Sequence, residues 1–190
     1  MAAEYKPTIE ELLQRNKEYA SAHKPVGSLM TRMKNNPKAY GPHVLIVSCL
    51  DSRSDPFDFL KLVPRECLVL RNIGGRFSTV AEQIAALDTL FHISQVVLVH
   101  HSNCGASHLT KQQVLDSVRE KRPEFTEFKE LEARMPVKED NHKSVIEDLQ
   151  EVKHNGFLRE DLIDAFAGVW LDVETGLLTR VYADGSASKI

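Results

Sequence analysis

The chain has 190 residues, 42% hydrophobic and 27% charged, with a formal net charge of -3 at pH 7. This length fits one compact domain with a sizeable core and is short for two. The slightly acidic balance, without a Lys/Arg cluster, argues against a nucleic-acid partner. No stretch reaches the ~18 consecutive apolar residues of a membrane span, and the N-terminal segment is too acidic and polar for a signal peptide. We therefore expect a cytoplasmic protein that binds neither nucleic acid nor membranes.

Cysteine content and the C-terminal residues bear on the compartment. Three cysteines in a chain without an export signal indicate reduced thiols, which are free to bind a metal, rather than a disulfide framework. The last residues, Ser188, Lys189 and Ile190, differ from the Ser-Lys-Leu peroxisomal address only in the final position. We favour an unstructured tail, because that address is normally read with leucine, and keep a peroxisomal location as the alternative.

The first predicted element is a helix. Thr8 and Glu11 form a capping-box pattern before a helical stretch that runs to about residue 23. Pro25 and Gly27 then break the pattern and lead into a polar connection.

Three short apolar runs, rich in valine and leucine, are typical of parallel strands that are covered on both faces. They span residues 43–47, 67–70 and 95–100. A second capping-box pattern at Thr79 and Glu82 predicts a crossover helix between the second and third runs.

Later segments predict two more helices and a hairpin. Helical spacing indicates helices from about residue 110 to 121 and from 144 to 154, whereas residues 123–140 show no clear pattern. Two apolar runs flank the turn residues 174–176, which predicts a C-terminal β-hairpin. The whole order predicts an α/β fold with an open, mostly parallel β-sheet flanked by helices, an N-terminal helix and a C-terminal β-hairpin.

Unusual residues cluster where the predicted strands end. Cys49 follows the first run, Arg71 and Asn72 follow the second, and His101 and Cys104 follow the third. In open α/β sheets, ligands bind at the carboxyl ends of the strands. We therefore expect three distant segments to meet at one edge of the sheet.

Cys49, His101 and Cys104 together predict a metal centre. Singly, each is more typical of a buried core residue or of a hydrogen-bonded histidine. The segment H-S-N-C places histidine and cysteine three residues apart, and Cys49 completes a Cys2His set. That set suits zinc. Three protein ligands that leave the fourth coordination position of the metal open are typical of a catalytic site. Cys67 has no partner at ligand spacing and is predicted to lie in the core.

Asp51 and Arg53 are the candidate catalytic residues beside this centre. In an extended segment both would share a face with Cys49. A zinc vacancy can hold water as hydroxide near neutral pH. Asp51 could accept a hydrogen bond from that hydroxide, or bind the metal as a fourth ligand and close the site. A bidentate grip by Arg53 would hold the carboxylate off the metal, although a plain surface ion pair is the alternative.

Glycines close to the predicted centre are candidate substrate-binding residues. The segment R-N-I-G-G at 71–75 could expose backbone N–H groups beside a helix start, a setting that suits small anions. Gly74 in this segment and Gly105, which follows Cys104, are the candidates, and a plain turn explains the glycines of the segment as well. No dinucleotide or P-loop motif accompanies them, so nucleotide binding lacks its usual support.

The motifs C-L-D-S-R (49–53), R-N-I-G (71–74) and H-S-N-C-G (101–105) together resemble those of the β-class carbonic anhydrases, particularly the short form. The resemblance covers at least residues 43–109. It implies one domain over residues 1–190, with an N-terminal helical arm (1–40) and a catalytic α/β core (41–190).

The resemblance also implies a function and an assembly. Zinc would be held by Cys49, His101 and Cys104, with Asp51 and Arg53 as the catalytic dyad. A zinc-bound hydroxide would hydrate carbon dioxide reversibly to bicarbonate and a proton. The family forms homodimers or higher homo-oligomers, in which the N-terminal helix packs on the partner and the active site lies near the interface.

Two departures from the family pattern bear on the substrate pocket. Ile73 stands where alanine is common, and Asn103 precedes the second cysteine where other members differ. The pocket separates carbonic anhydrases from relatives that hydrolyse carbonyl sulfide or carbon disulfide with the same zinc set. A non-catalytic zinc protein, with Asp51 as a permanent fourth ligand, is an alternative of another class. A thiol redox protein ranks last, because Cys49 and Cys104 form no C-x-x-C motif.

Overall fold

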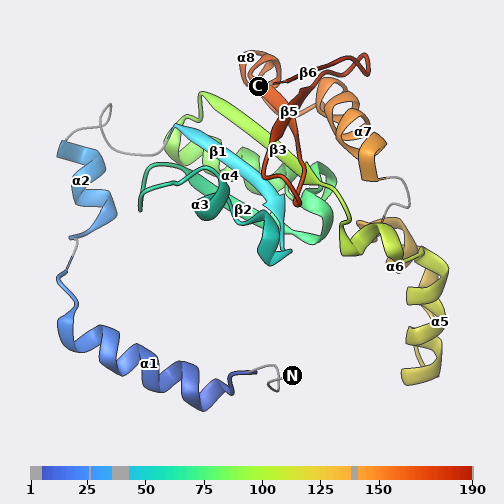
Figure 1. Cartoon of the computed structure of the whole chain (residues 1–190), viewed down its shortest axis with the longest axis horizontal. Coiled ribbons are helices and arrows are strands. Elements are labelled where there is room, and N and C mark those ends of the chain that lie inside the picture. Colours follow the sequence, from blue (N-terminus) through green and yellow to red (C-terminus); the bar gives the residue numbers. More distant parts are fainter. Residues whose placement is uncertain (1–5, 26, 36–42, 138–140, 190) are drawn as a thin grey trace. The chain divides into compact units, whose positions relative to one another are not determined.

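The computed structural model describes residues 6–25, 27–35, 43–137 and 141–189 (Figure 1). The chain divides into two compact units, residues 1–40 and 41–190, and each is described by itself. That the two units form one domain stays a prediction.

The N-terminal unit contains helix α1 (Ile9–Ala22) and helix α2 (Leu29–Asn35). The predicted capping box of α1 is confirmed: the Glu11 N–H donates to Thr8 Oγ1 over 3.2 Å, and the Thr8 N–H donates to Glu11 Oε2 over 2.7 Å. No residue of α1 is buried, so its apolar side chains are exposed to solvent.

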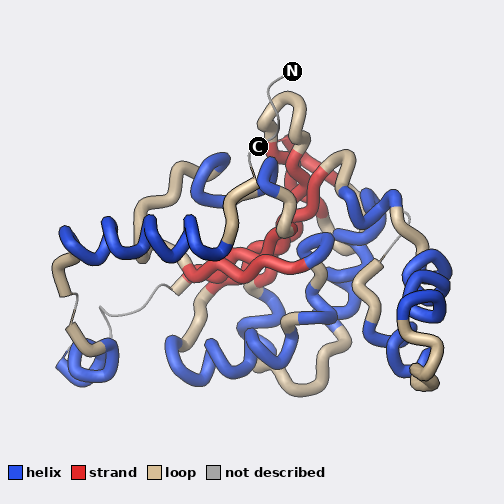
Figure 2. Tube along the Cα trace, turned by 90° about the horizontal axis from the view of Figure 1, so that it is seen from below, coloured by secondary structure: helices blue, strands red, loops and turns tan. Residues whose placement is uncertain are grey.

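The second unit is built on one six-stranded sheet with the order β2-β1-β3-β4-β5-β6. Its strands are β1 (Val44–Cys49), β2 (Leu68–Asn72), β3 (Gln95–His101), β4 (Phe166–Leu171), β5 (Leu178–Val181) and β6 (Ala187–Lys189). The first four strands pair in parallel, and β5 and β6 pair antiparallel. Figure 2 shows the strands of the sheet in red. The predicted fold class is confirmed, including the C-terminal hairpin of β4 and β5.

Helices lie in the connections between these strands. They are α3 (Pro56–Phe59), α4 (Ala81–Phe91), α5 (Lys111–Lys121), α6 (Phe128–Arg134), α7 (Asn141–Lys153) and α8 (Glu160–Asp164). The main core lies between the sheet and helices α4 and α7, where Ile84 and Val145 pack with Leu45 and Leu98. A second, smaller cluster around Val99 covers the other face of the sheet.

The central position of β1 and β3 places the candidate site. These strands are hydrogen-bonded neighbours, and Ser48 lies opposite Val99 in the register. Cys49 and His101 are the last residues of their strands rather than the first residues after them. Both therefore sit at the carboxyl edge of the sheet.

Two local predictions were wrong. Thr79 does not cap α4: the N-cap is Val80, which makes no side-chain cap, and the Thr79 hydroxyl instead accepts a hydrogen bond from Asn72 Nδ2. The expected unstructured tail is also wrong up to Lys189, because residues 187–189 form β6 and pair with β5. Ile190 lies outside the described residues.

Among the described residues, no helix combines the length and the apolar character that crossing a membrane requires.

Candidate metal centre

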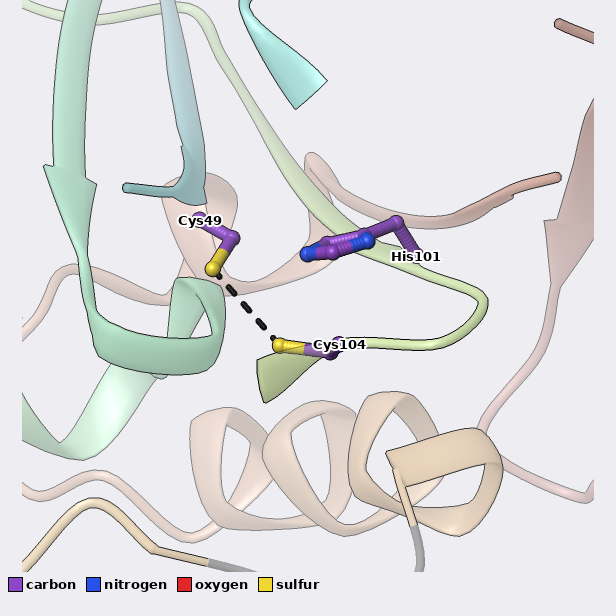
Figure 3. A group of neighbouring side chains, drawn as sticks. All are labelled: Cys49, His101 and Cys104. Atoms are coloured by element: carbon purple, nitrogen blue, oxygen red, sulfur yellow. Dashed lines mark hydrogen bonds between the residues drawn. The ribbon is translucent and has the colours of Figure 1, made fainter. Parts of the chain in front are cut away.

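Side chains of Cys49, His101 and Cys104 point toward one another at the carboxyl edge of the sheet (Figure 3). All three residues are buried, and their potential ligand atoms lie within 4.8 Å of one another. The two sulfur atoms are 3.6 Å apart. The structure thus brings together the three residues that the sequence predicted as metal ligands.

The chain reverses after β3 to bring Cys104 back beside His101. Ser102 extends the β3–β4 pairing by donating its N–H to Leu171 O over 2.9 Å. Asn103 then adopts a left-handed backbone conformation with φ +49°, which asparagine tolerates better than most residues. This turn explains why a spacing of three places both side chains at one point.

Hydrogen bonding fixes the orientation of the His101 ring. Its Nδ1 atom lies 2.9 Å from Ser102 O, and because a carbonyl oxygen only accepts, Nδ1 carries the proton. In the neutral ring, Nε2 then carries the lone pair that can bind a metal. A neutral imidazole held in this way is the usual form of a metal-binding histidine.

The donor set fits zinc in both chemistry and spacing. Two sulfurs at ~2.3 Å from one ion, subtending a tetrahedral angle, lie about 3.8 Å apart. The observed separation of 3.6 Å is close to that value. Two thiols and one imidazole are also donors that zinc prefers.

The Cys49 sulfur lies in a setting that stabilises a thiolate. The Cys104 thiol lies within hydrogen-bond distance, and the backbone N–H groups of Gly74 and Asp51 donate to the sulfur over 3.3 Å and 3.5 Å. Against the opposing effect of burial, these contacts lower the pKa of Cys49 to about 4, with the Cys104 contact as the largest cause. The same contact, together with burial, raises the pKa of Cys104. Cys49 is therefore the first of the two thiols to ionise.

Asp51 and Arg53 form the predicted pair, but not through an extended segment. The strand ends at Cys49, and residues 52–54 form a 3-10 turn, so the predicted alternation of faces is wrong beyond Cys49. Arg53 grips Asp51 through Nε to Oδ1 over 3.0 Å and through Nη2 to Oδ2 over 2.6 Å. These hydrogen bonds lower the pKa of Asp51 to about 2.

Arg53 also links the two arms of the site. Its Nη2 donates to Asn103 O over 2.9 Å, which ties the turn after β1 to the turn after β3. Within the described residues, the group that could hold a metal does not include the Asp51 carboxylate. The structure therefore shows Asp51 engaged by Arg53.

Sequence reasoning missed what Arg71 does. Its Nε donates to Cys49 O over 3.0 Å, and its Nη2 donates to Asp51 O over 2.8 Å. Its Nη1 pairs with Asp55 Oδ2 at 2.6 Å. Arg71 thus fixes the backbone that follows Cys49. The sequence signal that could have predicted these contacts is the position of this arginine at the end of β2, the strand beside β1.

Gly74 and Gly105 lie at the edge of the site in different settings. The Gly74 N–H donates to the Cys49 sulfur rather than facing outward toward an anion. Gly105 is exposed, and nothing lies within 4 Å of where a β-carbon would be. A role for either glycine in binding substrate stays a prediction.

Comparison with known proteins supplies the family. The family model for carbonic anhydrase matches residues 44–178. The chain belongs to this family.

Similar proteins place it in the β class. Beta-carbonic anhydrase 1 of Mycobacterium tuberculosis is 25% identical, and the match covers 90% of this chain and 96% of that protein. The solved carbonic anhydrase of Glaciozyma antarctica shares 25% identity with a TM-score of 0.70, again over 90% and 96% of the two chains. The resemblance in the sequence motifs is thus confirmed, as is the expectation of a carbonic anhydrase enzyme.

One relative of this β-carbonic anhydrase has a different named activity. Carbon disulfide hydrolase of Saccharolobus solfataricus is 25% identical over 115 residues, which covers 60% of this chain and 50% of that protein. Membership of the family therefore leaves the choice between these reactions to the chemistry of the site.

Proposed function

We propose that this β-carbonic anhydrase holds zinc through Cys49, His101 and Cys104 and catalyses the reversible hydration of carbon dioxide to bicarbonate and a proton. The convergence of these three donors, with the sulfurs 3.6 Å apart, carries the proposal. Zinc bound there supplies a Lewis acid that makes water nucleophilic near neutral pH.

Asp51 and Arg53 have distinct roles in this proposal. The hydrogen bonds from Arg53 keep Asp51 ionised. Oδ1 accepts from both the Arg53 backbone N–H and Nε, whereas Oδ2 accepts only from Nη2 and retains a lone pair that can accept from the attacking water. Asp51 thereby orients the nucleophile. Arg53 holds Asp51 in place, which keeps the position beside the three donors open to water.

Hydrolysis of carbonyl sulfide or carbon disulfide at the same metal centre is the alternative. The similarity of the chain to a carbon disulfide hydrolase supports this alternative. Turnover of carbon dioxide, carbonyl sulfide and carbon disulfide by the purified zinc protein, measured side by side, separates the two. Negligible hydration of carbon dioxide beside rapid hydrolysis of a sulfur substrate would decide for the alternative.

A non-catalytic zinc protein, closed by Asp51 as fourth ligand, is the alternative of another class. The bidentate contact with Arg53 argues against it, because the carboxylate would have to leave the guanidinium to reach the metal. Zinc-loaded protein that is inert toward all three substrates across the neutral pH range would favour this alternative.

The decisive experiment compares two cysteine variants. Cys104→Ser removes a proposed ligand, so we expect the loss of both bound zinc and hydration activity. Cys67→Ser is the matched control, because Cys67 is half-buried beside the second core cluster and lies outside the ligand group. Metal analysis and stopped-flow hydration are measured on both. Full zinc and activity in Cys104→Ser would contradict the proposal.

Assembly into a homodimer or a higher homo-oligomer, in the cytoplasm, is part of the same proposal. Helix α1 carries apolar side chains, and none of its residues is buried. An apolar helix face of this kind usually packs on another surface. A second copy of this chain is the partner that we propose.

A further inference from the structure

The loop between β2 and α4 delivers a backbone donor to the proposed metal centre. Within it, the Gly74 N–H donates to Cys49 Sγ over 3.3 Å. A hydrogen bond from an N–H to a ligand sulfur withdraws electron density from the sulfur and fixes the orientation of the cysteine side chain. Such contacts outside the ligand set change the metal affinity of a site. The position of this loop therefore affects how Cys49 can bind a metal.

A buried carboxylate from α7 holds this loop. Asp148 is fully buried, and its Oδ2 accepts a hydrogen bond from the Phe77 N–H over 2.9 Å. Its Oδ1 lies 2.5 Å from Arg76 Nη2, and only 4% of the Arg76 side chain is exposed. Both partners belong to the loop. A helix that follows the metal-ligand segments along the chain thus clamps the loop that serves Cys49.

His100 holds the same loop from β3. Its Nε2 lies 3.1 Å from Gly75 O, which accepts a hydrogen bond from it, and 3.1 Å from the Asp148 Oδ2 carboxylate oxygen. Its Nδ1 lies 2.6 Å from Ser144 Oγ on α7. Gly75, Arg76 and Phe77 are consequently all bound to one buried network.

Internal contacts tie the residues of the loop to one another. The Asn72 side chain accepts from the Arg76 N–H over 2.7 Å and donates to Arg76 O over 2.8 Å, which closes the loop on itself. Gly75 packs so closely on β3 that a β-carbon there would lie 2.7 Å from Val99 O. A displacement at Arg76 or Phe77 is therefore transmitted to Gly74.

We propose that Asp148 is a positioning residue of the metal centre, which acts through Arg76 and the Phe77 N–H to hold Gly74 at hydrogen-bond distance from the Cys49 sulfur. The inference rests on the proposed metal site and names a determinant of it outside the ligands. Asp148 is not one of the proposed ligands, and its polar partners are Arg76, Phe77 and His100. A merely structural carboxylate would stabilise the fold without affecting the Gly74 contact.

Two matched variants of the full chain separate these roles. Asp148→Asn keeps the size of the side chain and removes the charge that pairs with Arg76. Asp88→Asn is the control, because Asp88 has the same kinds of partner elsewhere: it pairs with Arg159 Nε at 2.8 Å and accepts the Ile93 N–H over 2.8 Å.

The readout is a nuclear magnetic resonance signal from cadmium-113-substituted protein. A hydrogen bond to a metal-bound sulfur gives a scalar coupling between cadmium and the amide proton, here that of Gly74. We expect the coupling in wild type and in Asp88→Asn, and at most half of it in Asp148→Asn. Zinc affinity should fall about 10-fold to 100-fold in Asp148→Asn alone, as for other outer partners of metal ligands.

Each result of these measurements either supports or overturns the inference. Equal coupling and equal zinc affinity in the two variants, or no Gly74 coupling in wild type, would overturn the inference while leaving a zinc-loaded, active enzyme intact. Wild type that binds neither cadmium nor zinc would overturn the proposed function itself. If Asp148→Asn does not fold, the doubly neutral variant D148N with R76Q takes its place under the same criteria.

Discussion

Arg53 shows how one side chain can organise a site at the ends of two strands. Its guanidinium contacts both oxygens of Asp51 and the Asn103 carbonyl, so it joins the turn after β1 to the turn that precedes Cys104. A planar fork with several donors can make these contacts together, whereas an ammonium group acts as a point charge. The charge alone is therefore not enough at this position.

Arg53→Lys tests this geometric requirement. We expect kcat/KM for hydration to fall about 10-fold to 100-fold, because Asp51 loses its bidentate partner, as when outer partners of a metal site are removed. Zinc content should stay unchanged, because all three proposed ligands remain. Arg119→Lys is the control, since Arg119 forms an exposed pair with Asp116 at 2.7 Å. Wild-type activity in Arg53→Lys would show that charge suffices.

Gly75 is required by close packing as well as by its backbone conformation. Gly75 and Gly176 have similar φ values, +69° and +72°, so alanine at either position costs roughly 1–2 kcal/mol from backbone strain. At Gly75 the β-carbon would also lie 2.7 Å from Val99 O, whereas at Gly176 nothing lies within 4 Å. We expect urea unfolding to show an additional loss of about 1–3 kcal/mol for Gly75→Ala. Equal losses in the two variants would contradict the packing argument.

At the scale of elements, local patterns predicted a helix cap only where nothing else competed for the capping side chain. Thr8 and Glu11 form the predicted capping box. Thr79 and Glu82 have the same spacing, yet the Thr79 hydroxyl is engaged by Asn72, which lies at the end of β2. A tertiary contact of this kind leaves no trace in the spacing of residues.

The strands and the ligand set were predictable because their signals are strong and local. Continuous apolar runs mark β1, β2 and β3, and parallel pairing then brings Cys49 and His101 to one edge. Strand β6 was not predictable from the sequence, because Ala187–Lys189 is an exposed edge strand without an apolar pattern. The link from Asp148 to Phe77 was equally hidden, because the two residues are 71 positions apart.

Contact between α7 and β4 depends on a residue without a side chain. A β-carbon at Gly168 would lie 2.7 Å from Leu149 Cδ1 and 2.8 Å from Val145 Cγ1, both on α7. Gly168→Ala should therefore lower the free energy of unfolding by about 1–3 kcal/mol, the usual cost of overpacking. Gly156→Ala, where nothing lies within 4 Å, is the control for urea unfolding. Unchanged stability in Gly168→Ala would mean that the leucine and valine side chains move aside freely.

At the scale of the whole molecule, α1 lacks, among the described residues, the packing that usually stabilises a helix. The helix has 14 residues and no buried side chain. Isolated helices of this length are marginal in water, and most helical stability in proteins comes from packing of an apolar face. The exposed face carries Ile9, Leu12, Leu13 and Tyr19. Contact with a second copy would supply the packing.

Replacing the centre of that face should dissociate the assembly. Leu12→Glu combined with Leu13→Glu keeps good helix formers at both positions. It places two charges where two leucines would be buried, and burial of each leucine side chain stabilises the interface by about 1.5–3 kcal/mol. Because 1.4 kcal/mol corresponds to a factor of ten, we expect the dissociation constant to rise at least about 100-fold, measured by sedimentation equilibrium. Gln14→Glu is the control, since residue 14 lies away from the apolar stripe of the helix. A double variant that sediments like wild type would mean that α1 does not hold the copies together, and the assembly would then have to rest on residues outside this helix.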